Sequence, residues 1–296
     1  MRTTMEDYMN DYIISSETSC DLPESYYESG RILSVPLYYT FDEATVYGDE
    51  KKLSEAEFYG KLRDGKMPKT MASNLETVLN LFRSVLDSGR DLIHVSFSSA
   101  LSSSYNNAML AAELLRPDYP ERKIEIVDSL SASLGQGLLI DAALRKMDEG
   151  YSFEELFTWL EENKLRLCHV FTVDDLHFLQ HGGRISKATA VLGSLINVKP
   201  VLRINDEGQL VSLANVRGRK KALLALVDRM AETVGDSENT TVFISHGDCL
   251  EDAETVGRMV TERFGITDIR YGYVGTAIGS HSGPGTVALF FFGEHR

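Results

Sequence analysis

Short apolar runs alternate along the chain with longer segments in which apolar residues recur every three or four positions. The short runs predict buried strands, and the longer periodic segments predict amphipathic helices. In the first half of the chain we expect strands at residues 12–14, 34–41, 92–97 and 123–127.

The helical periodicity is clearest after residue 73. The apolar positions there are Leu75, Val78, Leu79, Phe82, Val85 and Leu86. Ser73 and Glu76 form a capping-box pattern that predicts the start of this helix, and Gly89 ends it. Further helices are expected at 105–115, 132–147 and 152–163, the last beginning with a second capping pattern at Ser152. Strands that alternate with helices predict a mostly parallel sheet covered by helices.

The pattern changes in the second half of the chain. Further strands are expected there at residues 167–173, 200–204, 209–216, 242–245, 269–274 and 287–292. Asn205-Asp206-Glu207-Gly208 separates two of them, which is typical of a hairpin and therefore of antiparallel pairing.

We therefore predict two α/β domains. Residues 11–164 form the first, with a mostly parallel sheet covered by helices, and residues 165–296 form the second, with a mixed or antiparallel sheet and helices. Residues 1–10 are polar and charged and are expected to be a disordered or extended leader. They lack the apolar centre of a signal peptide.

Charge and composition exclude several classes of partner. The 44 acidic and 30 basic residues give a net charge of −14, which disfavours binding to nucleic acid or to an anionic membrane surface. No run approaches the roughly 18 apolar residues of a membrane span, so we expect no stable membrane insertion. The three cysteines are far apart and show no metal-ligand spacing, which favours reduced thiols, a cytoplasmic location and no bound metal.

A serine-rich turn, Ser98 to Ser104, is the most informative segment for function. It follows a predicted strand and precedes a helix, which is where ligands bind in open α/β sheets. The free N–H groups of the helix start suit an anion, and hydroxyls such as those of Ser99 and Ser102 add donors. The alternative is that Ser102 simply caps its helix, which this segment by itself favours.

Three further residues are candidates for the same anion. Thr70 precedes the helix at residue 75, His281 lies among four glycines and a proline between residues 275 and 285, and Arg184 follows Gly182 and Gly183. Their ordinary interpretations are a turn threonine, a histidine hydrogen-bonded to backbone and a surface arginine.

Taken together, these segments resemble the DegV family. Eight motifs occur in the expected order: Glu17-Thr18-Ser19 followed by Asp21-Leu22-Pro23, Val35-Pro36-Leu37, Ser98 to Ser102, Asp128-Ser129, Gly182 to Ser186, Lys199-Pro200, Val216-Arg217 and His281 to Gly285. The resemblance extends from about Tyr12 to Phe292, and the order of the motifs makes it specific.

The resemblance implies a two-domain α/β protein that buries one long-chain fatty acid in a tunnel and performs no chemistry alone. Carried over by motif, Thr70 and Ser102 bind the carboxylate, with Ser99 in the same turn, and His281 and Arg184 lie at the same end. The family further implies a separate fatty acid kinase that converts the bound acid to an acyl phosphate for lipid synthesis, with Arg217 at the docking surface. It implies no metal and no cofactor other than the bound acid.

Two segments depart from the family pattern. Thr70-Met71-Ala72-Ser73-Asn74 stands where the family commonly has Thr-Ser-Gln-Pro-Ser, and Ser102-Ser103-Ser104-Tyr105 stands where it has Ser-Gly-Thr-Tyr. Thr70, Ser102 and Tyr105 are retained, so we expect the carboxylate site to persist. The missing proline and glycine are expected to change the shape of the tunnel.

Two enzymatic alternatives remain at this point. A serine-dependent hydrolase of acyl esters would use Ser98, Ser99 or Ser102 as nucleophile with His281 as base, although the chain has no GxSxG motif. A nucleotide-binding enzyme is less well supported, because the GxGxxA pattern at residues 283–288 leads into a predicted strand rather than a helix. His246-Gly247-Asp248-Cys249 is interpreted as a loop and not as a metal site.

Overall fold

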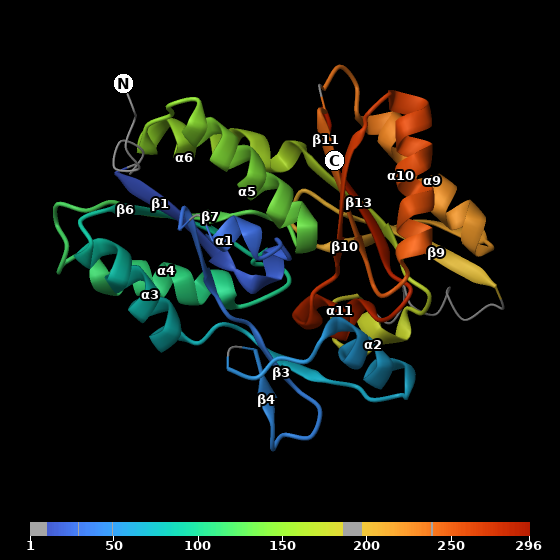
Figure 1. Ribbon diagram of the computed structural model, residues 1–296, viewed down its shortest axis with the longest axis horizontal. Coiled ribbons are helices and arrows are strands. Elements are labelled where there is room, and N and C mark those ends of the chain that lie inside the picture. Colours follow the sequence, from blue (N-terminus) through green and yellow to red (C-terminus); the bar gives the residue numbers. More distant parts are fainter. Residues whose placement is uncertain (1–10, 29, 49, 186–196, 238) are drawn as a thin grey trace.

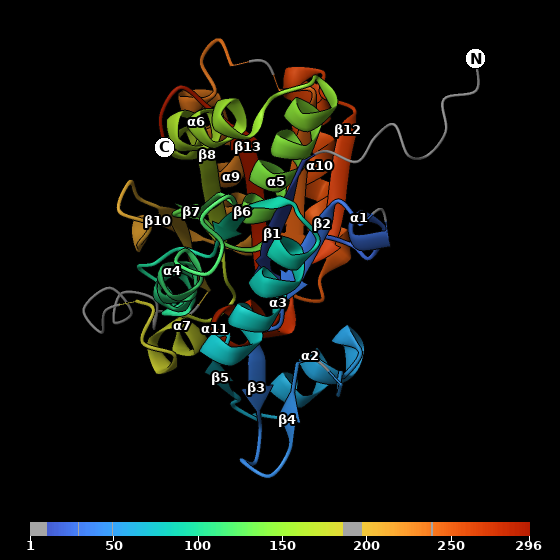
Figure 2. The same cartoon turned by 90° about the vertical axis from the view of Figure 1, so that its left-hand side faces the viewer.

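The computed structural model describes residues 11–28, 30–48, 50–185, 197–237 and 239–296. The predicted leader at residues 1–10 lies outside this part of the chain, as does Ser186 of the glycine–arginine motif. Two principal sheets lie side by side, and a smaller sheet lies below them (Figures 1 and 2).

The first principal sheet is entirely parallel, as the alternation of strands and helices predicts. Its strands lie in the order β2 (Ile32–Val35), β1 (Tyr12–Glu17), β6 (Asp91–Ser96) and β7 (Ile124–Asp128). One face packs against α3 (Leu75–Asp87) and α4 (Ser104–Leu115), and the other against α5 (Ser133–Asp148) and α6 (Phe153–Asn163). The predicted helix-covered parallel sheet is confirmed.

The second principal sheet is mixed. Its strands lie in the order β10 (Leu210–Arg217), β9 (Val198–Ile204), β8 (Leu167–Thr172), β13 (Val287–Phe292), β11 (Thr241–His246) and β12 (Asp268–Tyr273). All neighbours pair antiparallel except β11 and β12. The β9–β10 hairpin is the one predicted from Asn205 to Gly208, and helices α9 (Arg219–Thr233) and α10 (Leu250–Phe264) cover one face of the sheet.

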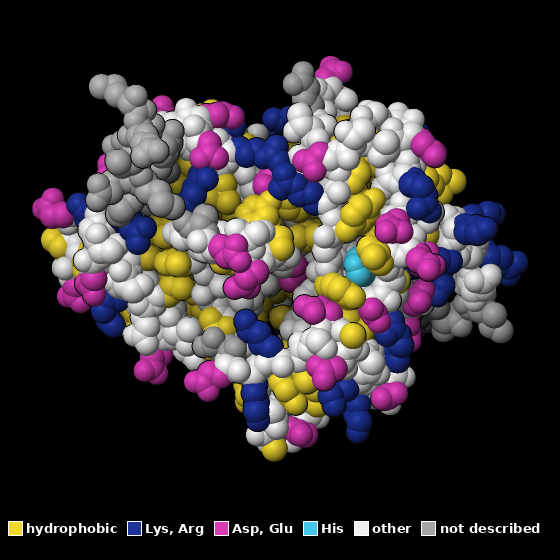
Figure 3. Space-filling model, viewed as in Figure 1, with side chains coloured by type: hydrophobic (Ala, Val, Ile, Leu, Met, Phe, Trp, Pro, Cys, Tyr) yellow, Lys and Arg dark blue, Asp and Glu magenta, His cyan; other side chains and the backbone are white. Residues whose placement is uncertain are grey.

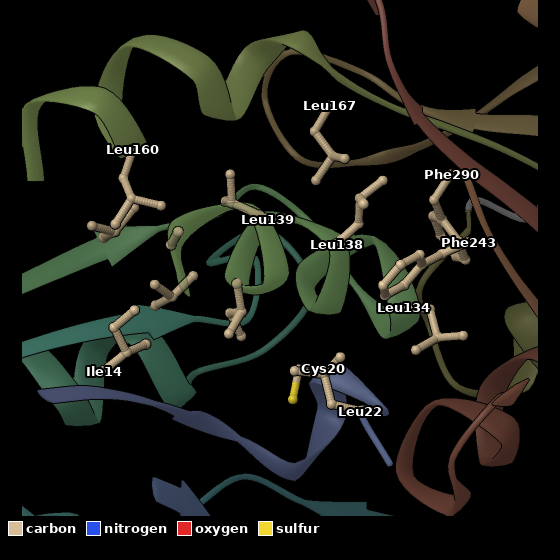
Figure 4. Packing of buried hydrophobic residues seen from close by; sticks show 14 of the residues in the cluster. Ile14, Cys20, Leu22, Leu134, Leu138, Leu139, Leu160, Leu167, Phe243 and Phe290 are labelled. Carbon is tan, nitrogen blue, oxygen red and sulfur yellow. The ribbon is translucent and has the colours of Figure 1, made fainter. Parts of the chain in front are cut away.

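Helix α5 joins the two principal sheets into one core. Leu138 and Leu139 of this helix belong to the same apolar cluster as Ile14 of the first sheet and Phe290 of the second. Figure 4 shows the α5 leucines between these two groups of side chains. Twelve of the sixteen residues of α5 are buried, and its leucines give the two domains a continuous hydrophobic contact.

The predicted single strand at 34–41 is wrong, because the chain leaves the first sheet at Pro36. It forms β2 before that residue and β3 (Tyr38–Thr40) after it, since proline has no N–H with which to continue a ladder. Strand β3 pairs with β4 (Val46–Tyr47) and β5 (Lys69–Met71) in the small sheet. Helix α2 (Glu55–Arg63) packs against this sheet through Phe58 and Tyr59. The small sheet and α2 together place Thr70 next to the second domain.

Two predicted helix starts have different outcomes. The capping box at Ser152 and Glu155 is confirmed, with both reciprocal hydrogen bonds present. The capping box at Ser73 and Glu76 is wrong: the helix is capped by Asn74, whose side chain accepts from the Thr77 N–H at 2.8 Å. Asparagine caps about as well as serine, so the tertiary position of the chain decides between the two neighbours.

Arg296 ties the two domains together near the end of the printed sequence. Its guanidinium is buried and donates to five backbone carbonyls, those of Ser129, Leu130, Lys164, Leu167 and Asn205. Burial lowers its pKa to about 10, which still leaves the group cationic at neutral pH. Three of the carbonyls lie before β8 and two lie within or after it, so one side chain bridges segments from both predicted domains.

None of the described helices combines the length and the apolar character that crossing a bilayer requires.

Candidate functional site

A cavity of about 250 Å³ lies where the carboxyl edge of the first sheet meets the inner face of the second. The carboxyl edge of a parallel sheet is the expected place for a ligand in this architecture. Both domains contribute apolar side chains to the wall: Phe97, Leu101, Phe171, Ile204, Leu210, Ala288 and Phe290.

Thr70 and His281 form a hydrogen-bonded pair at one end of this cavity. Thr70 Oγ1 and His281 Nε2 are 2.8 Å apart, although 211 positions separate the residues in the sequence. Thr70 comes from β5, and His281 from helix α11 (Thr276–Ser282) of the second domain. The domain contact therefore creates the pair.

Ser102 lines the same cavity from the serine-rich turn. Its Oγ lies 2.9 Å from Ser104 Oγ and accepts the Ser104 N–H at 3.2 Å. Ser103, rather than Ser102, occupies the N-cap position of α4, and it makes no side-chain capping bond. Ser102 thus borders both the helix start and the cavity.

Arg184 lies beside this turn and also lines the cavity. Its Nε donates to the Leu101 carbonyl at 3.1 Å, and its guanidinium also donates to the Gly182 carbonyl. Each of the two glycines before Arg184 is required for a different reason. Gly183 has a φ of +71°, and a Cβ on Gly182 would lie 1.9 Å from His281 Nδ1. Only a glycine at 182 leaves room for the imidazole.

The imidazole of His281 is neutral at physiological pH. Burial, and after it the charges of Arg184 and His181, together lower its pKa to about 4. Nδ1 is buried and has no hydrogen-bond partner among the described residues. The positive charge at this end of the cavity is therefore that of Arg184, and His281 acts as a neutral hydrogen-bonding group.

This depressed pKa predicts a loss of stability in mild acid. Below pH 6.5 the histidine is protonated in the unfolded chain and stays neutral in the folded one, so the unfolded state binds more protons. Between pH 7 and pH 5 the ligand-free protein should lose about 2 kcal/mol of unfolding free energy through His281. Urea unfolding of the wild type and His281→Gln at both pH values measures this difference. Equal losses in the two proteins would contradict it.

The structure does not bring Ser99 to the cavity. Ser99 is exposed, and its backbone N–H donates to the Asp128 carboxylate at 3.1 Å. Ser98 is buried, and its hydroxyl donates to the Gly208 carbonyl at 2.9 Å. Among the described residues no carboxylate is hydrogen-bonded to His281, whose partner is a threonine. The arrangement lacks the geometry of a Ser–His–Asp triad.

The other candidate segments have structural roles. Gly283 to Gly285 lead directly into β13, with no helix start to receive a phosphate. Gly247 exchanges backbone hydrogen bonds with Gly285 and Thr286, which fixes the loop after β11. The part of the chain that the structure describes contains no group of three or more His, Cys, Asp or Glu side chains placed to hold a metal ion.

Several residues of the deep wall did not stand out in the sequence. His169 is 4% exposed and lines the cavity, with Nε2 2.9 Å from Ser131 Oγ. It lies opposite Phe290 in the β8–β13 pair. Burial lowers its pKa well below the ordinary value. The alternation of residues along β8 and β13 could have identified this wall, because every second residue of a strand points to the same face.

The polar end of the cavity lies nearer the surface than the deep end. Thr70, Ser102, Arg184 and His281 are all partly buried, and Ser103 beside them is exposed. Phe290, at the deep end, is 2% exposed. Phe290 lies four positions after Thr286, whose hydroxyl donates to the Ser282 carbonyl at the end of α11. At about 3.3 Å per residue of extended chain, the two residues are about 13 Å apart.

The fold and the site define a class: two-domain α/β proteins that enclose an apolar cavity between their domains, with hydroxyl, imidazole and guanidinium groups at its outer end. A family model described as "Uncharacterised protein, DegV family" matches residues 13–294. The chain belongs to the DegV family, as its motifs predict.

Individual relatives agree with this assignment. A DegV domain-containing protein of Clostridium perfringens is 41% identical over 290 residues, which cover 97% of this chain and 99% of the relative. A stearic acid-binding protein from Eubacterium ventriosum is similar in structure, with a TM-score of 0.86 and 28% identity, covering 96% and 98% of the two chains. A fatty-acid-binding DegV family protein from Thermus thermophilus has a TM-score of 0.83 and 28% identity, covering 95% and 99%.

Proposed function

We propose that this protein binds one long-chain fatty acid in the cavity between its domains and presents the carboxylate to a separate fatty acid kinase. The observation that carries the proposal is an apolar cavity that ends at the Thr70–His281 pair, with Ser102 and Arg184 beside it. The fatty acids bound by the two structural relatives support the same ligand class.

The energetics of such a complex favour this orientation of the ligand. Burying hydrocarbon is worth about 0.8 kcal/mol per methylene, or roughly 10 kcal/mol for a chain of about 15 carbons before ordering costs. A desolvated carboxylate costs several kcal/mol unless it is hydrogen-bonded, and each bond to a charged group returns about 1.5–3 kcal/mol. The hydroxyls of Thr70 and Ser102 and the charge of Arg184 offset that cost. The tail thus supplies affinity, and the outer end sets the orientation.

Organic extraction of the purified protein followed by mass spectrometry tests the ligand class. We expect a co-purifying long-chain fatty acid at about one equivalent per chain. A protein that carries no fatty acid and takes up none after delipidation would overturn the proposal.

The kinase part of the proposal rests on access and charge. The partly exposed outer end leaves the carboxylate within reach of a second protein. Arg217, at the end of β10, is exposed, as are Lys220 and Lys221, whereas Arg219 is paired with Asp252 at 2.8 Å. On a chain of net charge −14, this basic cluster suits an acidic surface of a partner. We assign this activity to lipid synthesis in the cytoplasm, where the three unpaired cysteines would stay reduced.

Reversing the charge at Arg217 should separate docking from ligand binding. Arg217→Glu is expected to lower acyl-phosphate formation by a cognate fatty acid kinase by about tenfold or more, because like charges then meet at the interface. Fatty acid affinity should not change, since Arg217 does not line the cavity. Arg83→Glu, at an exposed position of α3, is the matched control. Simultaneous loss of binding and of phosphorylation in Arg217→Glu would contradict the docking role.

A further inference from the structure

A second hollow adjoins the cavity described above. It has a volume of about 650 Å³ and lies on the side of α1 (Ser25–Glu28), β3 and β12. Figure 3 shows a recess near the middle of the face seen in Figure 1, in the region between α1, β3 and α11. Part of its wall is apolar and aromatic, with Leu22, Tyr27, Leu53 and Phe243, and another part is charged, with Asp21, Glu24, Lys52, Glu55 and Arg270. The apolar part can accept hydrocarbon.

Leu37 and Ala277 are the two described residues that border both hollows. Leu37 comes from the loop between β2 and β3, and Ala277 comes from α11. The boundary between the hollows is therefore thin, and it is built by one residue from each domain. Leu37 is the larger of the two, so its side chain supplies most of the barrier.

This boundary lies next to the outer end of the cavity. Ala277 precedes His281 by four residues on α11, which places both on the same face one turn apart. Leu37 lies two residues before Tyr39, which pairs with Thr70 in the small sheet. A ligand whose carboxylate is held near Thr70 and His281 would have its first carbons beside Leu37 and Ala277.

The backbone holds Leu37 in place. Its N–H donates to Thr18 Oγ1 at 3.0 Å, and the residue is 6% exposed. The residue before it, Pro36, restricts the local backbone further. A leucine fixed in this way gives a defined wall rather than a mobile one.

We propose that Leu37, with Ala277, is a specificity-determining residue that closes the second hollow to the ligand and thereby restricts the site to acids unbranched next to the carboxylate. This inference rests on the proposed function. Truncating Leu37 would connect the two hollows beside the second carbon of the ligand. A branch at that carbon could then occupy the apolar part of the second hollow.

Two isomeric acids test this inference, because they contain the same atoms and differ in branching at that carbon. Hexadecanoic acid is straight, whereas 2-hexyldecanoic acid carries a six-carbon branch on its second carbon. Affinities for delipidated protein are measured by isothermal titration calorimetry. The wild type should prefer the straight acid by about tenfold or more, and Leu37→Ala should reduce that preference at least about tenfold.

Three variants make the comparison decisive. Leu22→Ala makes the same truncation at a residue that borders only the second hollow and should keep the wild-type preference. Leu37→Met conserves side-chain volume and should keep it as well. Leu37→Val is a milder truncation that should reduce the preference partly, and it decides the question if Leu37→Ala does not fold.

The outcomes separate this inference from the proposed function. If the wild type binds the two isomers equally, or if Leu37→Ala and Leu37→Val keep the wild-type preference, Leu37 does not determine specificity although fatty acid binding stands. If the wild type binds neither acid, the proposed function itself fails.

Discussion

Replacing Thr70 by valine and Ser102 by alanine together should weaken fatty acid binding by about a hundredfold or more, and each single change by about tenfold. Each substitution removes one hydroxyl from the outer end of the cavity and leaves its shape almost intact. A hydrogen bond to a charged group contributes about 1.5–3 kcal/mol, and 1.4 kcal/mol corresponds to a factor of ten in affinity. Thr70→Val also leaves His281 Nε2 without its threonine partner, which adds to the loss.

The same turn provides the control for this prediction. Ser99→Ala removes a hydroxyl only three positions from Ser102, but Ser99 is exposed and lies outside the cavity wall. Its fatty acid affinity should match that of the wild type, measured by titration calorimetry on delipidated protein. Wild-type affinity in the double variant would show that the carboxylate is held elsewhere.

Replacing Arg296 by alanine should destabilise the protein by about 3–5 kcal/mol, the range seen when one partner of a buried charged network is removed. The guanidinium satisfies five carbonyls, with donor–acceptor distances from 2.7 to 3.4 Å. Alanine removes a donor from all five acceptors, and each one that then stays buried without a partner costs more than the lost contact alone. Asn205 is an exception, because its carbonyl also accepts from the Gly208 N–H at 3.0 Å. The free energy of unfolding in urea measures the effect.

Two further variants give this prediction its controls. Arg296→Lys keeps the charge but not the planar fork, so its stability should lie between those of the wild type and Arg296→Ala. Arg263→Ala removes an exposed arginine paired with Asp228 at 2.6 Å, and such a pair contributes at most about 1 kcal/mol. A similar loss in Arg263→Ala and Arg296→Ala would contradict the bridging role of Arg296.

Ligand binding should also depend on the contact between the domains. Thr70 lies on β5 of the small sheet and His281 on helix α11 of the second domain, and α5 and Arg296 join the two principal sheets. A destabilised domain contact would misplace the pair even with every binding residue present. Arg296→Ala protein that remains folded at low temperature is therefore a useful second sample for the fatty acid titration.

Much of this protein could be inferred from its sequence, because the relevant signals are local. Periodicity and turn chemistry predict the parallel sheet of the first domain, the mixed sheet of the second and the hairpin at Asn205 to Gly208. The same kind of analysis gave Thr70, Ser102, Arg184 and His281 as candidates, and the resemblance to the DegV family joined them, with Ser99, in one site. All of them except Ser99 line one cavity. Glycine, serine and histidine carry their possible chemistry in any surroundings, so they can be recognised before the fold is known.

Tertiary structure determined which residue takes a role where local preferences are nearly equal, and which residues come into contact where partners lie far apart in the chain. Asn74 rather than Ser73 caps its helix, because both residues can cap and only packing distinguishes them. Ser99 and Ser102 are the same residue type in the same turn, yet only Ser102 faces the cavity. The second hollow behind Leu37 and the five carbonyls around Arg296 exist only once distant segments have packed together. A linear pattern records which groups a residue carries, whereas burial and neighbours across the domain contact determine what those groups meet.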